Sequence, residues 1–269
     1  MGGHNEGSSP PVKPMPCYPR TSGATGYRLP ITRLPPMRFA IVRFPGTWSD
    51  RDCQHVLRDV LRQQADIVWH RETDLSGFDA VVLPGGYSYG DYLRCGAIAR
   101  FSPIMESVAK FADEGRPVIG ICNGFQVLCE SHILPGVLMR NASLQFRCEW
   151  RHITCAGADT PWTASIPAGD VLHIPISHAD GNYFADAKTL EQLEDTNRVA
   201  FRYCDAAGNV TPDANPNGSV NNIAGIVNER GNVLGMMPHP ERAGEAIVGG
   251  TDGNRIWRSL IEQAVATVA

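Results

Sequence analysis

One stretch of the chain joins a buried strand, a cysteine and the start of a helix within a few residues. Residues 117–121 form an apolar strand-like run, and a helix begins at about Asn123, so Cys122 stands at the junction. Gly120 and Gly124 flank the cysteine, and only small residues fit beside such a tight turn. The Gly-x-Cys-x-Gly pattern therefore predicts a strand–turn–helix that holds the thiol exposed above a sheet.

A thiol in this position is suited to act as a nucleophile. The helix that follows Cys122 directs free N–H groups and the positive end of its dipole toward the sulfur, which favours the reactive thiolate. A cysteine between a strand and a helix can also be a packing residue, because free cysteine often behaves as a small apolar side chain. The pattern favours the nucleophile, but the choice also depends on finding a base elsewhere in the chain.

Composition and charge argue against several other classes of protein. The 269 residues are 43% hydrophobic and 19% charged, which is ordinary for a globular chain that buries a full core. The formal net charge of −4 argues against nucleic acid as a partner, and no apolar stretch is long enough to span a membrane. The eight cysteines include no Cys-x-x-Cys pair, so we expect no metal site, no disulfide framework and a reducing, cytoplasmic location.

The chain divides into a proline-rich N-terminal segment and a long patterned region. Residues 1–36 contain many prolines, a single acidic residue (Glu6) and no periodic apolar pattern, so we expect them to be disordered or a non-native extension. Residues 37–269 are expected to form a single domain, because the candidate catalytic residues are spread over both of its halves.

Strands and helices alternate in the first half of the patterned region. The expected elements are strands at 38–44, 66–69, 79–83 and 117–121, with helices at about 50–64, at 103–114 and from 123 onward. This alternation implies parallel pairing in a doubly wound α/β sheet. Sites in such sheets lie at the carboxyl ends of the strands, where Gly85-Gly86 and Cys122 both fall.

The second half has a different pattern. It predicts antiparallel strands at 146–154, 171–176 and 199–204, a loop over 205–222, a hairpin formed by strands at 223–227 and 233–237, and a final helix at 251–268 whose apolar residues Ile256, Leu260, Ile261, Ala264 and Val268 repeat at helical spacing. The expected fold is therefore an α/β protein with a doubly wound, mostly parallel sheet and additional antiparallel strands in the C-terminal half.

The segment Pro238-His239-Pro240-Glu241 supplies the base that a thiolate nucleophile needs. Its prolines should keep the chain extended, and residues i and i+2 of an extended segment point the same way. Glu241 could then orient the imidazole of His239 while the other ring nitrogen faces Cys122. A capped strand end with a surface His and Glu is the plainer interpretation. His178 is the rival base.

Acyl transfer also needs hydrogen-bond donors for the oxyanion. The backbone N–H of Asn123, at the start of the helix, is one candidate. The Gly85-Gly86 turn is the other, although the same turn can simply end a strand.

These residues converge on a known family. Gly120-Ile-Cys122-Asn-Gly-Phe-Gln126, together with the segment around His239, resembles the class I (triad-type) glutamine amidotransferases. Longer stretches at 83–97, 215–219 and 235–243 are similar to a member of that family that serves purine biosynthesis, and the resemblance runs from about Met37 to the C-terminus.

The resemblance implies a flavodoxin-like sheet and the hydrolysis of glutamine to glutamate and ammonia. In this reading Cys122 attacks the side-chain amide of glutamine, His239 serves as acid and base, and Glu241 orients His239. It further implies that Gly86 and Asn123 donate to the oxyanion and that Gln126 helps to hold glutamine.

The resemblance also implies partners. Ammonia would pass to a separate synthetase subunit that uses ATP and magnesium, and a small third subunit would complete the complex, so no cofactor is expected on this chain. The alternatives are a glutaminase subunit for a different synthetase, a cysteine-elbow hydrolase that is not a glutaminase, and an inactive scaffold. Peptidase-like hydrolases of that type would have a histidine where Asn123 stands, and a scaffold would typically have lost Cys122 or His239.

Two positions depart from the family pattern. The first turn has Trp48 where the family usually has asparagine, and His178-Ala-Asp-Gly181 stands in place of His-Gly-Glu-Gly. Both lie outside the three proposed catalytic residues, so we expect them to affect partner contacts or the detail of the substrate pocket.

Overall fold

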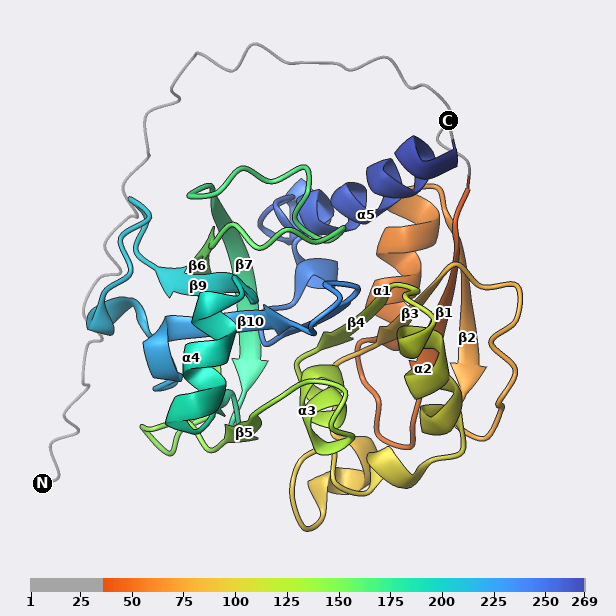
Figure 1. Cartoon of the computed structure of the whole chain (residues 1–269), viewed down its shortest axis with the longest axis horizontal. Coiled ribbons are helices and arrows are strands. Elements are labelled where there is room, and N and C mark those ends of the chain that lie inside the picture. The colour runs from red at the N-terminus through yellow and green to blue at the C-terminus, as the bar shows by residue number, and fades with distance from the viewer. Residues whose placement is uncertain (1–35, 269) are drawn as a thin grey trace, which may run out of the picture. The chain divides into compact units, whose positions relative to one another are not determined.

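The computed structural model describes residues 36–268 (Figure 1), so the expectation for residues 1–36 lies, apart from Pro36, outside the described residues. The described chain forms a nine-stranded sheet in the order β2-β1-β3-β4-β11-β10-β9-β6-β7 and a two-stranded sheet of β5 and β8. The expectation of a single domain over residues 37–269 stays a prediction.

The strands are β1 (Arg38–Arg43), β2 (Gln64–Trp69), β3 (Ala80–Leu83), β4 (Val118–Ile121), β5 (Val137–Met139), β6 (Arg147–Cys155), β7 (Val171–His178), β8 (Asn182–Phe184), β9 (Val199–Cys204), β10 (Ile223–Val227) and β11 (Val233–Met236). The α-helices are α1 (Asp50–His55), α2 (Ile104–Asp113), α3 (Asn123–Glu130), α4 (Ala187–Asp195) and α5 (Gly253–Val268). Short 3-10 helices lie in several of the connections between them.

The two halves of the large sheet pair differently. Strands β2, β1, β3, β4 and β11 are parallel neighbours, whereas β10, β9, β6 and β7 continue the sheet in antiparallel pairing. This confirms the predicted fold class. Strands β3 and β4 are buried along their whole length, as expected for parallel strands covered on both faces.

From β1 the chain crosses to β2 at one edge of the sheet, and from β3 it crosses in the opposite direction to β4. Because crossovers between parallel strands are right-handed, α1 and α2 cover opposite faces. Figure 1 shows α2 and α3 in front of the parallel strands. The direction reverses between β1 and β3, and ligand sites lie beside such a reversal, at the carboxyl ends of the strands.

The antiparallel half returns to this same edge. Three strands separate β7 from β11 in the sheet, yet the N–H of His239, just after β11, donates to the carbonyl of Pro175 in β7 at 2.8 Å. The sheet therefore curls, and the end of β7 meets the loops that follow β3, β4 and β11.

The first helix differs from its prediction. It was expected to run to about Gln64, but α1 ends at His55, a π-helical turn covers Val56–Val60, and Gln64 already begins β2. Arg62 has a positive φ of 61°, which stops the helix, and the N–H of Gln64 joins the sheet through the carbonyl of Met37 at 2.9 Å.

Helix α4 and the small sheet of β5 and β8 were not predicted. The Oδ1 atom of Asp186 caps α4 by accepting the N–H of Thr189 at 2.7 Å, and this Asp-x-x-Thr signal is present in the sequence. Strands β5 and β8 have three residues each, too few for an alternating pattern to be recognised.

The final helix agrees with its predicted apolar stripe. Ile256, Leu260 and Ile261 are at most 2% exposed, and Ala264 packs against the same core. The side chain of Val268, the last member of the stripe, lies outside the described part of the chain.

The contact between β3 and α3 leads to a stability prediction. In most helices Gly→Ala stabilises by about 1 kcal/mol. A Cβ on Gly124 of α3 would lie 1.9 Å from the carbonyl oxygen of Leu83, so we expect Gly124→Ala to destabilise the protein instead, by about 2 kcal/mol.

Urea unfolding measures this change. Gly250→Ala is the control, because its Cβ would come no closer than 3.3 Å to the Trp150 ring and 3.9 Å to the carbonyl oxygen of His173, and its φ is not positive. Equal midpoints for the two variants would contradict the close approach of α3 to β3.

Candidate active site

Cys122 is the single residue between β4 and α3, and its backbone is strained. It has φ 52° and ψ −106°, a conformation that L-residues rarely adopt. Two hydrogen bonds hold it there: its N–H donates to the carbonyl of Met236 at 2.8 Å, and its carbonyl accepts the N–H of Gln126 at 3.1 Å. Pairing with β11 thus continues into the turn, and the first turn of α3 closes on the cysteine.

Gly85 lets the neighbouring loop approach this turn. A Cβ on Gly85 would lie 2.7 Å from the His239 ring and 3.4 Å from the Cβ of Cys122. The N–H of Gly85 donates to the hydroxyl of Ser49 at 2.9 Å. Ser49 directly precedes α1, but its side chain makes no capping bond to that helix and instead positions this loop.

His239 and Glu241 form a buried pair beside the cysteine. The Nδ1 atom of His239 lies 2.6 Å from Oε1 of Glu241, and the two residues are 2% and 3% exposed. The predicted contact is present, but the predicted extended backbone is not. A 3-10 helix covers Pro240–Arg242, since proline is tolerated in the first turn of a helix, and this turn brings Glu241 back to the imidazole.

The charges of this pair outweigh the cost of burial. Burial lowers the pKa of His239, but the negative charges of Glu241 and Cys122 raise it from the usual 6.5 to about 10. Burial raises the pKa of Glu241, and the charge and hydrogen bond of His239 bring it below its usual value. The favoured state is therefore a carboxylate next to an imidazolium.

A pocket of about 130 Å³ opens directly onto Cys122 and His239. Its lining residues are Trp48, Gly86, Tyr87, Cys122, Ser177, His239 and Arg242. The Nε2 atom of His239 is buried and has no hydrogen-bond partner among the described residues, so it is available to a ligand or to the nearby sulfur. The Sγ atom of Cys122 lies 3.6 Å from the carbonyl oxygen of Ser177.

Four residues of this pocket were not singled out from the sequence as part of the site. Trp48 was noted only as a departure from the family pattern, and its ring contacts Tyr87 edge-on at 6.5 Å between centroids. Ser177 lies at the end of β7, and Arg242 follows Glu241. These residues could have been identified from the sequence, because they lie next to a strand end or next to a proposed catalytic residue.

The two predicted oxyanion donors have free amides. Gly86 lines the pocket, and its φ of 154° together with a contact of 2.6 Å from its Cβ position to Gly46 O requires glycine. Asn123 is the first residue of α3, so its N–H has no partner within the helix. Neither amide donates a hydrogen bond to another described group.

Gln126 does not line the pocket in this structure. Its Nε2 donates to the carbonyl of Asp180 at 2.6 Å, and its Oε1 accepts from Nδ2 of Asn123 at 2.9 Å. Its amide therefore braces α3 against the loop after β7. Its predicted role in holding glutamine stays a prediction.

The rival base, His178, is buried, and both of its ring nitrogens have partners. Nδ1 lies 3.1 Å from Oδ1 of Asn141, and the amide of Asn141 donates elsewhere, so Nδ1 carries the proton. Nε2 lies 3.5 Å from the amide nitrogen of Asn217. Burial, and after it the charge of His239, lowers the pKa of His178 to about 3, which keeps the ring neutral.

Within residues 36–268, no group of three or more His, Cys, Asp and Glu side chains is placed to hold a metal ion. None of the helices in this range is long and apolar enough to cross a membrane.

The charge state of His239 can be measured by NMR titration of its ring. We expect the imidazole to stay protonated at pH 7 and to titrate near 10, whereas His178 stays neutral. Because the folded pKa of His239 lies above its unfolded value, the contribution of this histidine to stability is complete below about pH 6.5 and is lost as the pH rises through about 10, whereas Glu241, whose pKa is lowered, contributes only while it stays ionised.

In Cys122→Ala, the pKa of His239 should fall, because one of the charges that raise it is gone. An unchanged titration in that variant would show that the sulfur and the imidazole are not coupled.

Comparison with known proteins identifies the family. A family model described as a CobB/CobQ-like glutamine amidotransferase domain matches residues 36–261. Phosphoribosylformylglycinamidine synthase subunit PurQ of Moorella thermoacetica is 55% identical over 226 residues, which cover 84% of this chain and 96% of the relative. The subunit of the same name from Thermomicrobium roseum is 54% identical over 225 residues, 84% of this chain and 95% of the relative.

A solved structure agrees with the sequence relatives. In the structure of PurLQS from Thermotoga maritima, one chain matches with a TM-score of 0.76 and 38% identity, over 85% of this chain and 99% of that one. Sequence and fold thus point to the same family across nearly all of the described residues. The chain belongs to the CobB/CobQ-like glutamine amidotransferases, as its resemblance to the class I enzymes implied.

Proposed function

We propose that this chain is the glutaminase subunit of a phosphoribosylformylglycinamidine synthase. It hydrolyses glutamine to glutamate and ammonia, and the ammonia serves a synthetase subunit that uses ATP to make formylglycinamidine ribonucleotide in de novo purine biosynthesis. The observation that carries this proposal is the buried His239–Glu241 pair beside Cys122, in a chain more than half identical to PurQ relatives over almost their full length.

The reaction begins with the thiolate of Cys122, which attacks the side-chain amide carbon of glutamine. The developing oxyanion lies between the amides of Gly86 and Asn123, which are free to donate to it. The C–N bond then breaks as the imidazolium of His239 gives its proton to the leaving nitrogen, which departs as ammonia.

The second half of the reaction releases glutamate. His239, now neutral, takes a proton from a water molecule that attacks the thioester carbon, the C–S bond breaks, and the thiolate of Cys122 is restored. Glu241 holds Nδ1 of the ring throughout at 2.6 Å, so that Nε2 faces the reacting atoms in both steps.

The partners follow from the chemistry and the relatives. The chain supplies ammonia but no nucleotide chemistry, so ATP and magnesium belong to the synthetase subunit, and a small third subunit completes the complex. We assign the complex to the cytoplasm, where the free cysteines Cys53, Cys95, Cys122, Cys129, Cys148, Cys155 and Cys204 stay reduced.

Replacement of the nucleophile tests the mechanism. We expect Cys122→Ala to abolish glutamine-dependent synthesis of the amidine by the reconstituted complex, because no thioester can form. Synthesis from added ammonium chloride should persist, since that reaction does not use this site. Glutamine-dependent synthesis at the wild-type rate would overturn the mechanism.

Replacement of His178 tests the choice of base. His178→Ala should leave glutamine hydrolysis within about tenfold of wild type and its pH profile unshifted. It should also lower stability by about 2 kcal/mol, because Asn141 and Asn217 lose a buried partner. A loss of hydrolysis equal to that of His239→Ala, in a folded protein, would show that His178 is the base.

A further inference from the structure

A second cavity adjoins the catalytic pocket. It has a volume of about 400 Å³ and lies between α1, strands β6 and β7 and the segment after His239. His239, Ser177 and Arg242 line both spaces, whereas Cys122 and Gly86 line only the smaller one and Glu241 lines only the larger. The imidazole therefore stands between the cysteine and the second cavity.

This arrangement matters for the product of the proposed reaction. Ammonia forms when His239 protonates the leaving nitrogen, so it is released next to the imidazole. At that moment the glutamyl group is still bound to Cys122 and occupies the 130 Å³ pocket through which glutamine entered. An exit on the other side of His239, between Ser177 and Arg242, avoids that occupied route.

The lining of the second cavity suits a small molecule that donates hydrogen bonds. Glu241 lines the inner wall, and its Oε2 has no hydrogen-bond partner among the described residues, but this oxygen is covered by protein atoms in the structure. Glu245 adds a second carboxylate. The rings of Trp150 and the side chain of Val248 add apolar surface to the wall.

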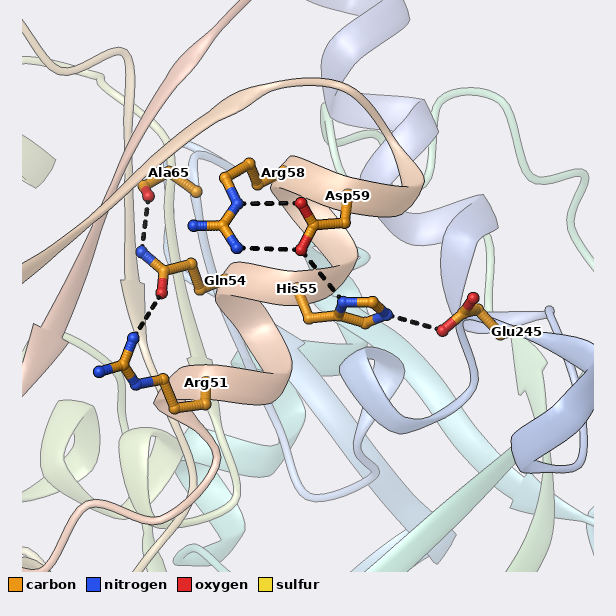
Figure 2. Close-up of polar contacts among 7 residues, drawn as sticks. All are labelled: Arg51, Gln54, His55, Arg58, Asp59, Ala65 and Glu245. Carbon is orange, nitrogen blue, oxygen red and sulfur yellow. Dashed lines mark hydrogen bonds and ion pairs between the residues drawn. The ribbon is translucent and has the colours of Figure 1, made fainter.

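A bridge between two distant segments forms part of the outer wall. His55 of α1 and Glu245 both line the cavity, and Nε2 of His55 lies 2.7 Å from Oε2 of Glu245. Nδ1 of the same ring lies 3.2 Å from Asp59 (Figure 2). The side chains of His55 and Glu245 are 50% and 42% exposed, so the bridge lies at the solvent-facing rim of the cavity.

We propose that the second cavity is the exit chamber for ammonia, entered past His239 and closed on its solvent side by the His55–Glu245 bridge. The proposal rests on the proposed function and extends it, because it states where the product leaves the triad. Glutamine enters through the smaller pocket, and ammonia leaves through the larger.

The first test fills the chamber in the reconstituted complex. Val248→Trp places an indole in the cavity, and Ile247→Trp adds the same group at the neighbouring residue, which is 91% exposed and does not line it. Glutamate release and amidine formation are measured together. Glutamate dehydrogenase with 2-oxoglutarate and NADH is added to the solution to consume any ammonia that escapes.

We expect Val248→Trp to lower the amidine formed per glutamate released by about threefold or more and to raise NADH oxidation to match. Ile247→Trp and synthesis from added ammonium chloride should resemble wild type. Equal ratios for the two tryptophan variants, in complexes that both assemble on gel filtration, would overturn the proposal.

The second test opens the chamber and does not depend on the first. His55→Ala removes the bridge to Glu245. Arg58→Ala is the control, because it removes an exposed ion pair with Asp59 and Arg58 does not line the cavity (Figure 2). More ammonia should escape from the His55 variant than from the Arg58 variant, at equal rates of glutamate release. The same leak from both variants would mean that the bridge does not close the exit.

These outcomes separate the two proposals. If the wild-type complex releases no glutamate from glutamine, the proposed function itself fails. If wild type couples the two reactions and both cavity variants behave as their controls, only the exit chamber fails.

Discussion

The backbone at Cys122 is the constraint on which the rest of the structure depends. A residue held at φ 52° and ψ −106° costs of order 1–3 kcal/mol, and it persists only where its surroundings leave no alternative. Here β4 is held between β3 and β11, the cysteine N–H is bonded to Met236, and the glycines at 120 and 124 let α3 lie directly against the strands. The parallel core thus supplies the restraint that keeps the thiol at the sheet edge.

The charged groups of the site, on Cys122, His239 and Glu241, lie at the same edge of the sheet. A buried histidine would normally lose its proton, but the carboxylate of Glu241 and the charge at Cys122 reverse that tendency at His239. His178, buried nearby without a carboxylate partner, stays neutral. Of these two buried histidines, one is therefore protonated and the other neutral, and the difference comes from the groups that face each ring. It also separates their roles: one ring can move protons, and the other holds the loops around Asn141 and Asn217.

Much of this site could be predicted because its residues follow strands. Cys122 and His239 each come just after a strand, and the structure makes these strands, β4 and β11, parallel neighbours that end at one edge of the sheet. For residues 238–241 the contact between His239 and Glu241 was predicted correctly, but the backbone was predicted as extended and is a 3-10 helix over Pro240–Arg242. Proline is compatible with both conformations, so the surrounding fold determines which one forms. The role of Gln126 in holding glutamine stays a prediction, and the hydrogen bonds of its amide to Asn123 and Asp180 are determined only by the packing of α3 against the loop after β7. The small sheet of β5 and β8 is too short to leave a periodic signal.

The sequence by itself determined the class of fold, the nucleophile candidate and the acid–base pair, since each depends on residue type and spacing along one strand or turn. The tertiary structure decided how the distant segments meet. Ser177 of β7 reaches Cys122 because the sheet curls, and His55 reaches Glu245 across most of the chain length to form part of the wall of the second cavity. Neither contact could be predicted from a local sequence pattern. Each joins residues that are far apart in the chain, and only the packing of the elements brings them together.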